Sequence, residues 1–316
     1  ILADAALEAK MLVPEMEKKG FSKEFSSVVP AASAMITPLI PPGIAMILYG
    51  CIANVSIGDL FISGIGVGLL LCVSMMILVR FVSKKRGYAP MRTTRVSGGE
   101  FVRALKPAIL PLLLPVIIIG GIRIGIFTAT EAGAVAIVYA MLLGIVYREM
   151  HWSDLKQGFK ETVCTTSSIM LIVAAAGVFS WVLTKERIPQ QLTEWIVSTI
   201  DNKYVFLLIV NIFLLIVGMF IEGNASMIIL VPLLHPIALA YGINEIQFAM
   251  TYIFNNAIGA LSPPMGTLMF VTCGITGCKT GKFIKEAVPF YILLAINLLL
   301  ITYVPVFSTG ILSLLG

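Results

Sequence analysis

The sequence carries two proline doublets in uncharged stretches: "SAMITPLIPPGIAMILYG" at residues 33–50 and "NNAIGALSPPMGTLMFVTCG" at residues 255–274. Proline removes a backbone hydrogen-bond donor and clashes with the preceding helical turn, so a doublet interrupts a helix. Each stretch sits in an apolar run, residues 25–58 and residues 246–278, that is longer than the roughly 20 residues that one membrane helix needs. The sequence therefore predicts two long spans, each broken near its centre.

The composition indicates an integral membrane protein. Of the 316 residues, 58% are hydrophobic and only 12% are charged, whereas soluble domains carry roughly a quarter charged residues. The apolar runs are long and continuous rather than alternating, which favours helices over a β-barrel. The net charge of +5 fits basic loops between spans, and nothing resembles a nucleic-acid-binding stripe. The five cysteines and two histidines lack the spacing of a metal site.

The loops set the orientation of the predicted spans. The other uncharged runs are residues 60–79, 107–122, 132–147, 162–184, 204–221 and 287–316. The loop 80–106 contains eight basic residues and one acid, and short basic loops stay in the cytoplasm. Counting spans from that loop puts the loop 185–203 outside, so the run 204–221 enters the membrane from outside.

The chain also contains an internal repeat. A shift of 222 residues superposes the two doublets and, without a gap, pairs Pro14 with Pro236 and Gly20 with Gly242. Corresponding loops differ in charge: "EKKGFSKE" has three lysines and its partner "LAYGINEI" has none, whereas "NVSIGD" has none and its partner "TGCKTGK" has two. Because basic loops face the cytoplasm, the two copies are expected to have opposite orientations in the membrane.

Inverted repeats with broken helices are typical of secondary transporters. A break in the hydrocarbon frees backbone carbonyls, at a cost of several kcal/mol per unsatisfied group, so a polar partner is required. Half-helix carbonyl ends suit Na⁺ and half-helix amino ends suit carboxylates. We therefore expect the breaks "TPLIPPG" (37–43) and "GALSPPMG" (259–266) to form a binding site. The alternative is a pair of kinks that only curve the helices for packing.

A re-entrant hairpin is predicted before the second break. The short apolar arms 204–221 and 225–241 flank a polar tip, Glu222-Gly223-Asn224. We expect this tip to meet the break at Ser262 near mid-membrane, which makes Glu222 an intramembrane acid and a candidate functional residue. An ordinary surface turn is the alternative. The repeat puts the equivalent first tip just before Ile1, so the first hairpin is expected to start upstream of this sequence.

The motifs resemble those of the large membrane subunit (M type) of the tripartite ATP-independent periplasmic (TRAP) transporters. The resemblance spans essentially the whole chain and rests on "ADAALEAKMLVPEM", "AASAMITPLIPPGIAMILYG", "LPVIIIGGIRIGIFTATEAGAVAIVYA", "VGMFIEGNASMIILVPLLHPI" and "NNAIGALSPPMGTLMFVTCGITG". It implies an all-α integral protein of the bacterial inner membrane, with re-entrant hairpins, two discontinuous helices and an elevator mechanism. The implied transport regions are residues 1–58 and 204–278, and the implied scaffold regions are residues 59–203 and 279–316.

The resemblance also implies partners and a binding site. The partners are a small membrane subunit (Q type) and a periplasmic binding protein (P type) that delivers an organic acid, such as a C4-dicarboxylate or sialic acid. Na⁺ is the coupling ion, and no other cofactor is implied. One Na⁺ would be held by Thr37, Ile40 and Pro42, with an upstream tip completing its shell. A second would lie between the tip at Glu222-Gly223 and three residues of the second break: Ser262, Met265 and Gly266. The substrate carboxylate would lie near Ala45, Glu222 and Asn224.

The sequence departs from the family pattern at two of these positions. Thr37 stands where Gly is common, and Glu222 stands where Asp is usual, so the acid reaches one methylene further. The segment "FTATEAG" (127–133) also matches the family, and a helix-capping role for Thr128 or Thr130 is one interpretation of it.

Three other functions remain open at the sequence level. A single-subunit Na⁺- or H⁺-coupled carboxylate symporter with the same repeat would share these motifs. A channel fits less well, because paired hairpins suit alternating access better than an open pore. An intramembrane enzyme needs a clustered nucleophile and base. The only histidine within the apolar runs, His235, lies between Pro232 and Pro236 with no Asp or Cys partner evident, which disfavours an enzyme.

Overall fold

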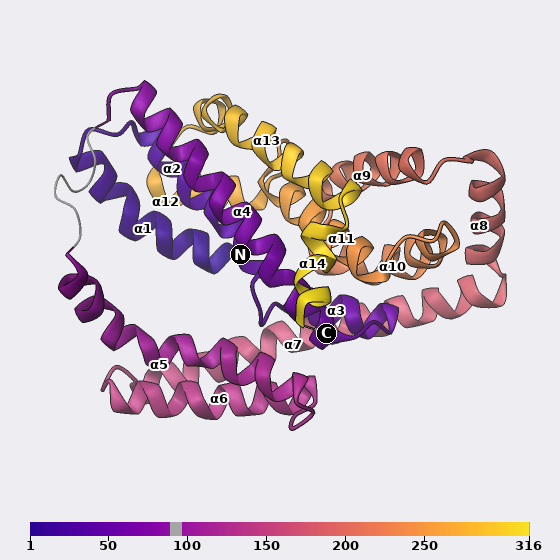
Figure 1. Cartoon of the computed structure of the whole chain (residues 1–316), viewed down its shortest axis with the longest axis horizontal. Helices are drawn as coiled ribbons and strands as arrows, with labels where there is room; N and C mark the ends of the chain where they lie inside the picture. The colour runs from indigo at the N-terminus through magenta and orange to yellow at the C-terminus, as the bar shows by residue number, and fades with distance from the viewer. Residues whose placement is uncertain (89–96, 316) are drawn as a thin grey trace. The chain divides into compact units, whose positions relative to one another are not determined.

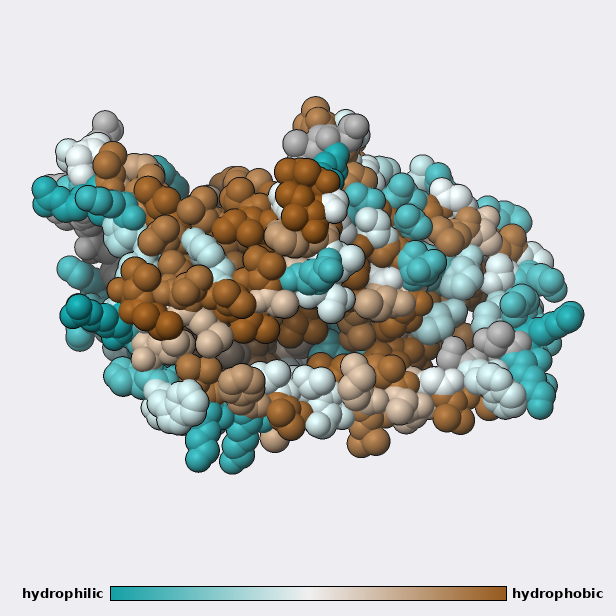
Figure 2. Space-filling view, turned by 90° about the horizontal axis from the view of Figure 1, so that it is seen from below, coloured by the Kyte–Doolittle hydropathy of each residue, from teal (hydrophilic) through white to brown (hydrophobic). Residues whose placement is uncertain are grey.

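The protein is a helical membrane protein. The computed structural model describes residues 1–88 and 97–315, and in these ranges the chain forms helices and no strand. Seven of the described helices are long and apolar enough to cross a membrane, or up to eight spans if one bent pair counts as a single span. Hydrophobic side chains cover broad areas of the face seen in Figure 2, as a lipid environment requires. The predicted class, an all-α integral membrane protein, is confirmed.

The helices form two compact units, shown along the chain in Figure 1. One unit contains both copies of the repeat. Its first copy comprises α1 (Leu2–Lys18), α2 (Lys23–Ser33), the 3₁₀-helix η1 (Ala34–Leu39), α3 (Ile44–Ala53) and α4 (Ile57–Lys85). Its second copy comprises α9 (Lys203–Phe220), α10 (Gly223–Ala240), α11 (Glu245–Leu261), α12 (Thr267–Thr276) and α13 (Thr280–Tyr303), followed by α14 (Val306–Leu315).

The helix boundaries follow the repeat register. A shift of 222 residues carries the start of α2 onto the start of α11, and the end of η1 onto the end of α11. The same shift brings the starts of α3 and α4 to within one residue of the starts of α12 and α13. The repeat found in the sequence is therefore also a repeat of helices. The breaks between the helices fall at corresponding positions in the two copies.

The basic loops meet at one end of this unit. Lys282 at the start of α13 forms an ion pair of 3.1 Å with Glu24 at the start of α2. The Tyr88 hydroxyl, just after α4, donates a hydrogen bond of 3.1 Å to Ser22 Oγ, just before α2. We call this the basic end, and its lysines and arginines identify it as cytoplasmic. Part of the predicted loop 80–106, residues 89–96, lies outside the described residues.

The opposite end is marked by a second set of contacts. Gln247 Nε2, in the first turn of α11, donates to the carbonyl of Thr302, near the end of α13, at 2.7 Å. The Tyr303 hydroxyl donates to the carbonyl of Tyr204, at the start of α9, at 3.0 Å. Thus α2 starts at the basic end, whereas its counterpart α11 starts at the opposite end. The two copies are inverted, as the loop charges predicted.

The other unit contains α5 (Gly98–Arg123), α6 (Ala129–Val146) and most of α7 (Trp152–Lys185). α5 and α6 lie side by side (Figure 1). The Thr128 hydroxyl accepts from the backbone N–H of Glu131 at 3.3 Å, and the Glu131 carboxylate accepts from the backbone N–H of Thr128 at 2.8 Å. This capping box starts α6, so Thr128, not Thr130, is the cap. α7 starts ten residues before the uncharged run 162–184, because the preceding polar residues continue the helix.

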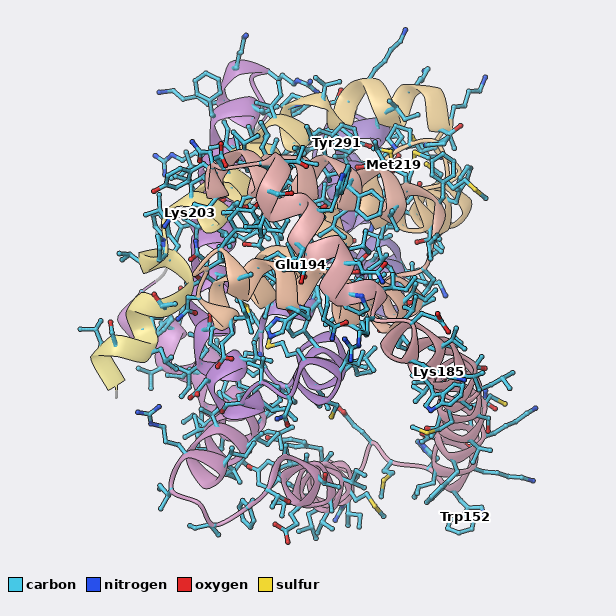
Figure 3. The ribbon with its side chains drawn as sticks, turned by 90° about the vertical axis from the view of Figure 1, so that its right-hand side faces the viewer. Trp152, Lys185, Glu194, Lys203, Met219 and Tyr291 are labelled. Carbon is cyan, nitrogen blue, oxygen red and sulfur yellow. The ribbon has the colours of Figure 1, made fainter. Side chains whose placement is uncertain are left out.

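The segment 185–203, predicted as a loop, contains the short helix α8 (Ile188–Thr199). Figure 3 shows α8, which carries Glu194, lying across the second-repeat helices. The Tyr241 hydroxyl at the end of α10 donates to the carbonyls of Ile196 and Ile200, at 3.2 and 2.6 Å. α8 was missed because it is short and its polar residues give no span-like signal.

Candidate functional site

The first proline doublet breaks a span between Leu39 and Ile44. The two halves of this span are bent by 41° relative to one another. Within the described ranges, no hydrogen bond reaches the carbonyls of Ile40 and Pro42. A Cβ on Gly43 would lie 2.8 Å from the carbonyl oxygen of Pro38, so the chain turns back tightly where only glycine fits. The break therefore leaves backbone acceptors without a helical partner.

The second doublet breaks the other span between Leu261 and Thr267. The carbonyls of Pro263, Pro264 and Met265 likewise accept no hydrogen bond from the described part of the chain. At both doublets the peptide bond between the prolines is cis. Both breaks thus leave backbone carbonyls without a partner among the described residues, as their matching sequences predicted.

Both breaks lie at the middle depth of the bundle. The Tyr291 hydroxyl donates to the carbonyl of Leu261, at the end of α11, at 3.1 Å. Tyr291 lies halfway along the 24 residues of α13, whose start contacts α2 at the basic end and whose last turn contacts α11 at the opposite end. At the first break, a Cβ on Gly68 of α4 would lie 2.9 Å from the Ile40 side chain. Each break thus packs against the middle turns of a spanning helix and not against a turn at the surface.

The hairpin tip follows α9 and begins α10. The Glu222 carboxylate accepts from the backbone N–H groups of Asn224 and Ala225, at 2.9 and 3.1 Å, and from Asn224 Nδ2 at 3.0 Å. The acid is therefore the N-cap of α10, where the helix dipole favours negative charge. Its side chain is exposed, so one side of the carboxyl group stays open. The sequence predicted the acid at the tip but not its capping role.

The tip rests on α11 before the second break. Asn256 Nδ2 donates to the carbonyl of Gly223 at 2.8 Å. The backbones of Gly218 and Gly259 touch, because a Cβ on Gly259 would lie 2.5 Å from the Gly218 Cα. These contacts lie one to two turns before Ser262. The sequence reasoning missed Asn256 and Gly259, although "NNAIG" directly precedes the break.

The predicted ion-binding residues differ in exposure. Ser262 is buried, and its hydroxyl donates to the carbonyl of Ile258 at 2.8 Å, which leaves its lone pairs available. Gly266 is also buried. Of the other predicted residues, Thr37, Ile40, Pro42 and Met265 are exposed, and Ala45 is partly exposed on the first turn of α3.

Backbone and hydroxyl oxygens are the ligands that these breaks offer. No group of three His, Cys, Asp or Glu side chains that could hold a metal ion occurs among residues 1–88 and 97–315. A cation bound at the breaks would therefore depend on neutral oxygens, which is the coordination that discontinuous helices offer to Na⁺.

A buried polar cluster holds the entering arm of the hairpin. Asn255 Nδ2 donates to the carbonyl and the side-chain oxygen of Asn211, at 3.0 and 2.9 Å. Asn211 Nδ2 donates in turn to Thr302 Oγ1 at 3.0 Å. All three side chains are buried. The cluster fastens α9 to α11 and α13, and the sequence analysis did not identify it.

Two buried side-chain pairs bind α10 to its neighbours. The Tyr49 hydroxyl, on α3 of the first copy, lies 3.0 Å from His235 Nδ1 on α10 of the second copy. Ser226 Oγ, also on α10, lies 2.9 Å from the Tyr252 hydroxyl on α11. His235 therefore has a tyrosine partner, and its hydrogen bond joins the two copies of the repeat.

Comparison with known proteins agrees with this architecture. Residues 1–307 match the family described as "Tripartite ATP-independent periplasmic transporter, DctM component". The chain is 39% identical over 308 residues to the sialic acid TRAP transporter large permease protein SiaM of Vibrio cholerae, covering 97% of this chain and 72% of that protein. It is 36% identical over 315 residues to the C4-dicarboxylate TRAP transporter large permease protein DctM of Pseudomonas aeruginosa, covering 99% and 73%.

A third relative has a longer chain. The isethionate TRAP transporter permease protein DctMQ of Oleidesulfovibrio alaskensis is 34% identical over 305 residues, which cover 96% of this chain and 48% of that protein. The match over nearly the whole sequence, together with the inverted repeat and the two mid-depth breaks, decides the assignment. The chain belongs to the DctM family of large TRAP transporter permeases, and it is a multi-pass inner-membrane transport protein rather than an enzyme.

Proposed function

We propose that this permease imports an organic acid by Na⁺-coupled symport, in which an elevator-type motion alternates access to the site. The observation that carries the proposal is the pair of inverted, mid-depth helix breaks whose carbonyls lack partners among the described residues. Unpaired carbonyls in hydrocarbon require a polar occupant, and a cation supplies one. Na⁺ bound at both breaks would stabilise a carboxylate between them.

The substrate class follows from the relatives. The names of the three relatives refer to sialic acid, a C4-dicarboxylate and isethionate, all of which are organic acids. For this chain we propose a carboxylate of the C4-dicarboxylate or sialic acid class. TRAP large permeases work with a periplasmic binding protein, and we propose that a small Q-type membrane subunit, separate or fused, completes the transporter.

The proposed site uses the residues predicted from the sequence. One Na⁺ is held by carbonyls of the first break, at Thr37, Ile40 and Pro42. A second is held between the hairpin tip at Gly223 and the second break, with ligands from Ser262, Met265 and Gly266. The substrate carboxylate lies near Ala45, Glu222 and Asn224. Because the Glu222 carboxyl oxygens act as hydrogen-bond acceptors at the tip, the contact that we propose is with a hydroxyl or amide of the substrate, or with an ion, rather than with the carboxylate itself.

Reconstitution tests the function directly. The permease and its small subunit are placed in liposomes, and the binding protein is added with radiolabelled sialic acid or C4-dicarboxylates. We expect uptake of one acid class when Na⁺ is high outside and little uptake when K⁺ replaces Na⁺. Equal uptake in Na⁺ and K⁺ would contradict the coupling. Full uptake without the binding protein would instead support the single-subunit symporter.

The Glu222→Gln substitution tests the hairpin tip. Glutamine keeps one oxygen for the N-cap but removes the charge, so we expect uptake to fall at least tenfold while the protein remains folded. Asn244→Ala is the matched control, because Asn244 caps α11 with two backbone contacts, at 2.9 and 3.1 Å, and lies at the opposite end rather than at the tip. Wild-type uptake by the Gln variant would assign Glu222 a capping role only.

A further inference from the structure

A groove on the repeat-containing unit lies beside the last turns of α4 and the first half of α13. It has a volume of about 360 Å³, and its lining residues are Leu78, Phe81, Val82, Lys85, Arg86 and Pro289. Four of the six are apolar and two are basic. Nothing in the proposed transport mechanism uses this groove, which lies at the basic end of the unit rather than at the breaks.

The groove runs from the hydrocarbon to the cytoplasmic headgroups. α4 has 29 residues and ends at the basic end, so its last turns reach the headgroup level. Leu78 lies about two turns deeper than Lys85, roughly 10 Å along the helix axis. Phe81, between them, is 66% exposed. The apolar wall therefore faces acyl chains, and the lysine lies among phosphates.

One of the two basic residues in the lining is already engaged. Arg86 Nη1 forms an ion pair with Glu286 on α13. Its guanidinium carbon also lies 5.5 Å from the centroid of the Phe25 ring, within cation–π range. These contacts hold the ends of α4 and α13 together. Arg86 thus shapes the groove, and its charge is largely compensated by Glu286.

Two further lysines are relevant: Lys85, which lines the groove, and Lys285, which lies on α13 one turn before the lining residue Pro289. Lys85 and Lys285 are both exposed, and no carboxylate among residues 1–88 and 97–315 lies within ion-pair distance of either ammonium group. Lys285 precedes Pro289 by four residues, so the two share one face of α13. Lys85 thus lines the groove from α4, and Lys285 lies on the α13 face that contributes Pro289 to it.

We propose that this groove binds an anionic glycerophospholipid of the cytoplasmic leaflet. One acyl chain packs against Leu78, Phe81 and Pro289, and the phosphate lies between the ammonium groups of Lys85 and Lys285. Basic groups at the cytoplasmic surface attract anionic lipids, and a basic pocket between helices selects their headgroups. Because α4 and α13 are counterparts in the two copies, the lipid joins both repeats at the inner leaflet.

Lipid retention tests the proposal. The purified transporter is mixed with dioleoylphosphatidylglycerol or dioleoylphosphatidylcholine, which have the same chains, and bound lipid is counted by native mass spectrometry. We expect the wild type to retain the glycerol lipid at least fivefold better than the choline lipid. The Lys85→Gln/Lys285→Gln variant should lose that preference. Lys18→Gln/Lys19→Gln, which removes two charges from the same end but outside the groove, should keep it.

A second variant distinguishes lipid binding in the groove from general electrostatic attraction to the basic end. Val82→Trp fills the groove and leaves every charge in place, so we expect it to lose retention as the lysine variant does. Added phosphatidylglycerol should raise the thermal unfolding midpoint of the wild type and the control, but of neither groove variant. Equal retention of both lipids by the wild type, or unchanged retention by the two groove variants, would overturn the proposal. These readouts do not involve Na⁺ or the transported acid.

Discussion

At the scale of single residues, small and neutral polar side chains decide the candidate site. Ser262 provides a buried hydroxyl at the second break, and its one donor is used within its own helix. Gly259 allows the hairpin arm to touch α11. Neither residue carries charge, so the ion binding that we propose would depend on oxygens that a formal charge count does not reveal.

Ser262→Ala tests the hydroxyl ligand. We expect the Na⁺ concentration for half-maximal uptake to rise about tenfold, which corresponds to roughly 1.4 kcal/mol, because one oxygen ligand is lost. Thr251→Val is the matched control, since the buried Thr251 hydroxyl makes the same type of bond, to the Gln247 carbonyl at 2.9 Å, far from the break. Uptake measured over a series of Na⁺ concentrations checks this, and an unchanged Na⁺ dependence in the alanine variant would remove Ser262 from the site.

Gly259→Ala tests the contact between the hairpin and α11. The added methyl group would lie 2.5 Å from the Gly218 backbone, so the arm must move and we expect uptake to fall at least tenfold. Gly274→Ala, in α12, meets no atom within 4 Å and should transport normally. If the initial uptake rates of both variants equal that of the wild type, the close approach of the tip has no functional role.

These residue-scale contacts were only partly predictable. Glu222 and Ser262 stood out as polar residues at predicted turns. Asn255, Asn256 and Gly259 did not, since the repeat gave no guidance there: their counterparts in the first copy are Ser33, Ala34 and Thr37. Contacts such as Asn211 with Thr302 join distant parts of the chain, and a neutral side chain in an apolar run does not identify its partner in advance.

At the scale of helices, the proline doublets and neighbouring glycines determine where helices end. Buried hydrogen bonds then connect one helix to another. The doublets marked both breaks, and the polar tip marked the hairpin, because each interrupts an apolar run that would otherwise form one helix. α8 gave no such signal. The bond between Tyr49 and His235 also lay beyond sequence reasoning, which found no Asp or Cys partner for His235 and did not consider tyrosine.

Tyr49→Phe tests the bond that joins the two copies. Removing the hydroxyl leaves His235 Nδ1 buried without its partner, and such a group costs about 1–3 kcal/mol. We therefore expect a lower thermal unfolding midpoint. Tyr147→Phe removes an exposed hydroxyl that donates to the Pro107 carbonyl at 2.8 Å, and it should have a much smaller effect. Equal midpoints for the two variants would show that the buried bond does not stabilise the fold.

At the scale of the whole molecule, two copies of one helical plan are packed in opposite orientations. Loop charges predicted the inversion because only one set of loops is basic, and the ion pair between Lys282 and Glu24 gathers those loops at one end. The division into transport and scaffold regions remains a prediction. The two compact units separate α5, α6 and most of α7 from the remaining helices. This division reflects contacts within the chain, and it does not coincide with the predicted transport and scaffold regions.

Cysteine labelling tests the inverted topology. Lys23 and Glu245 are repeat counterparts, both exposed, at the first positions of α2 and α11. In a chain whose native cysteines are replaced by alanine, Glu245→Cys should react with an impermeant maleimide added to the periplasmic side. Lys23→Cys should react only after the membrane is permeabilised. Labelling of both variants from the same side would contradict the inversion.

The central claim is that helix breaks at mid-depth leave peptide carbonyls to bind sodium, and equilibrium binding of radioactive ²²Na⁺ to the purified transporter tests it most directly. Pro263→Ala/Pro264→Ala restores backbone donors and lets the helix close across the break, so we predict loss of Na⁺ binding at that site. Pro107→Ala/Pro111→Ala replaces two prolines of α5, which belong to neither break, and should bind Na⁺ as the wild type does. Wild-type Na⁺ binding by the doublet variant, or no Na⁺ binding by the wild type, would contradict the account.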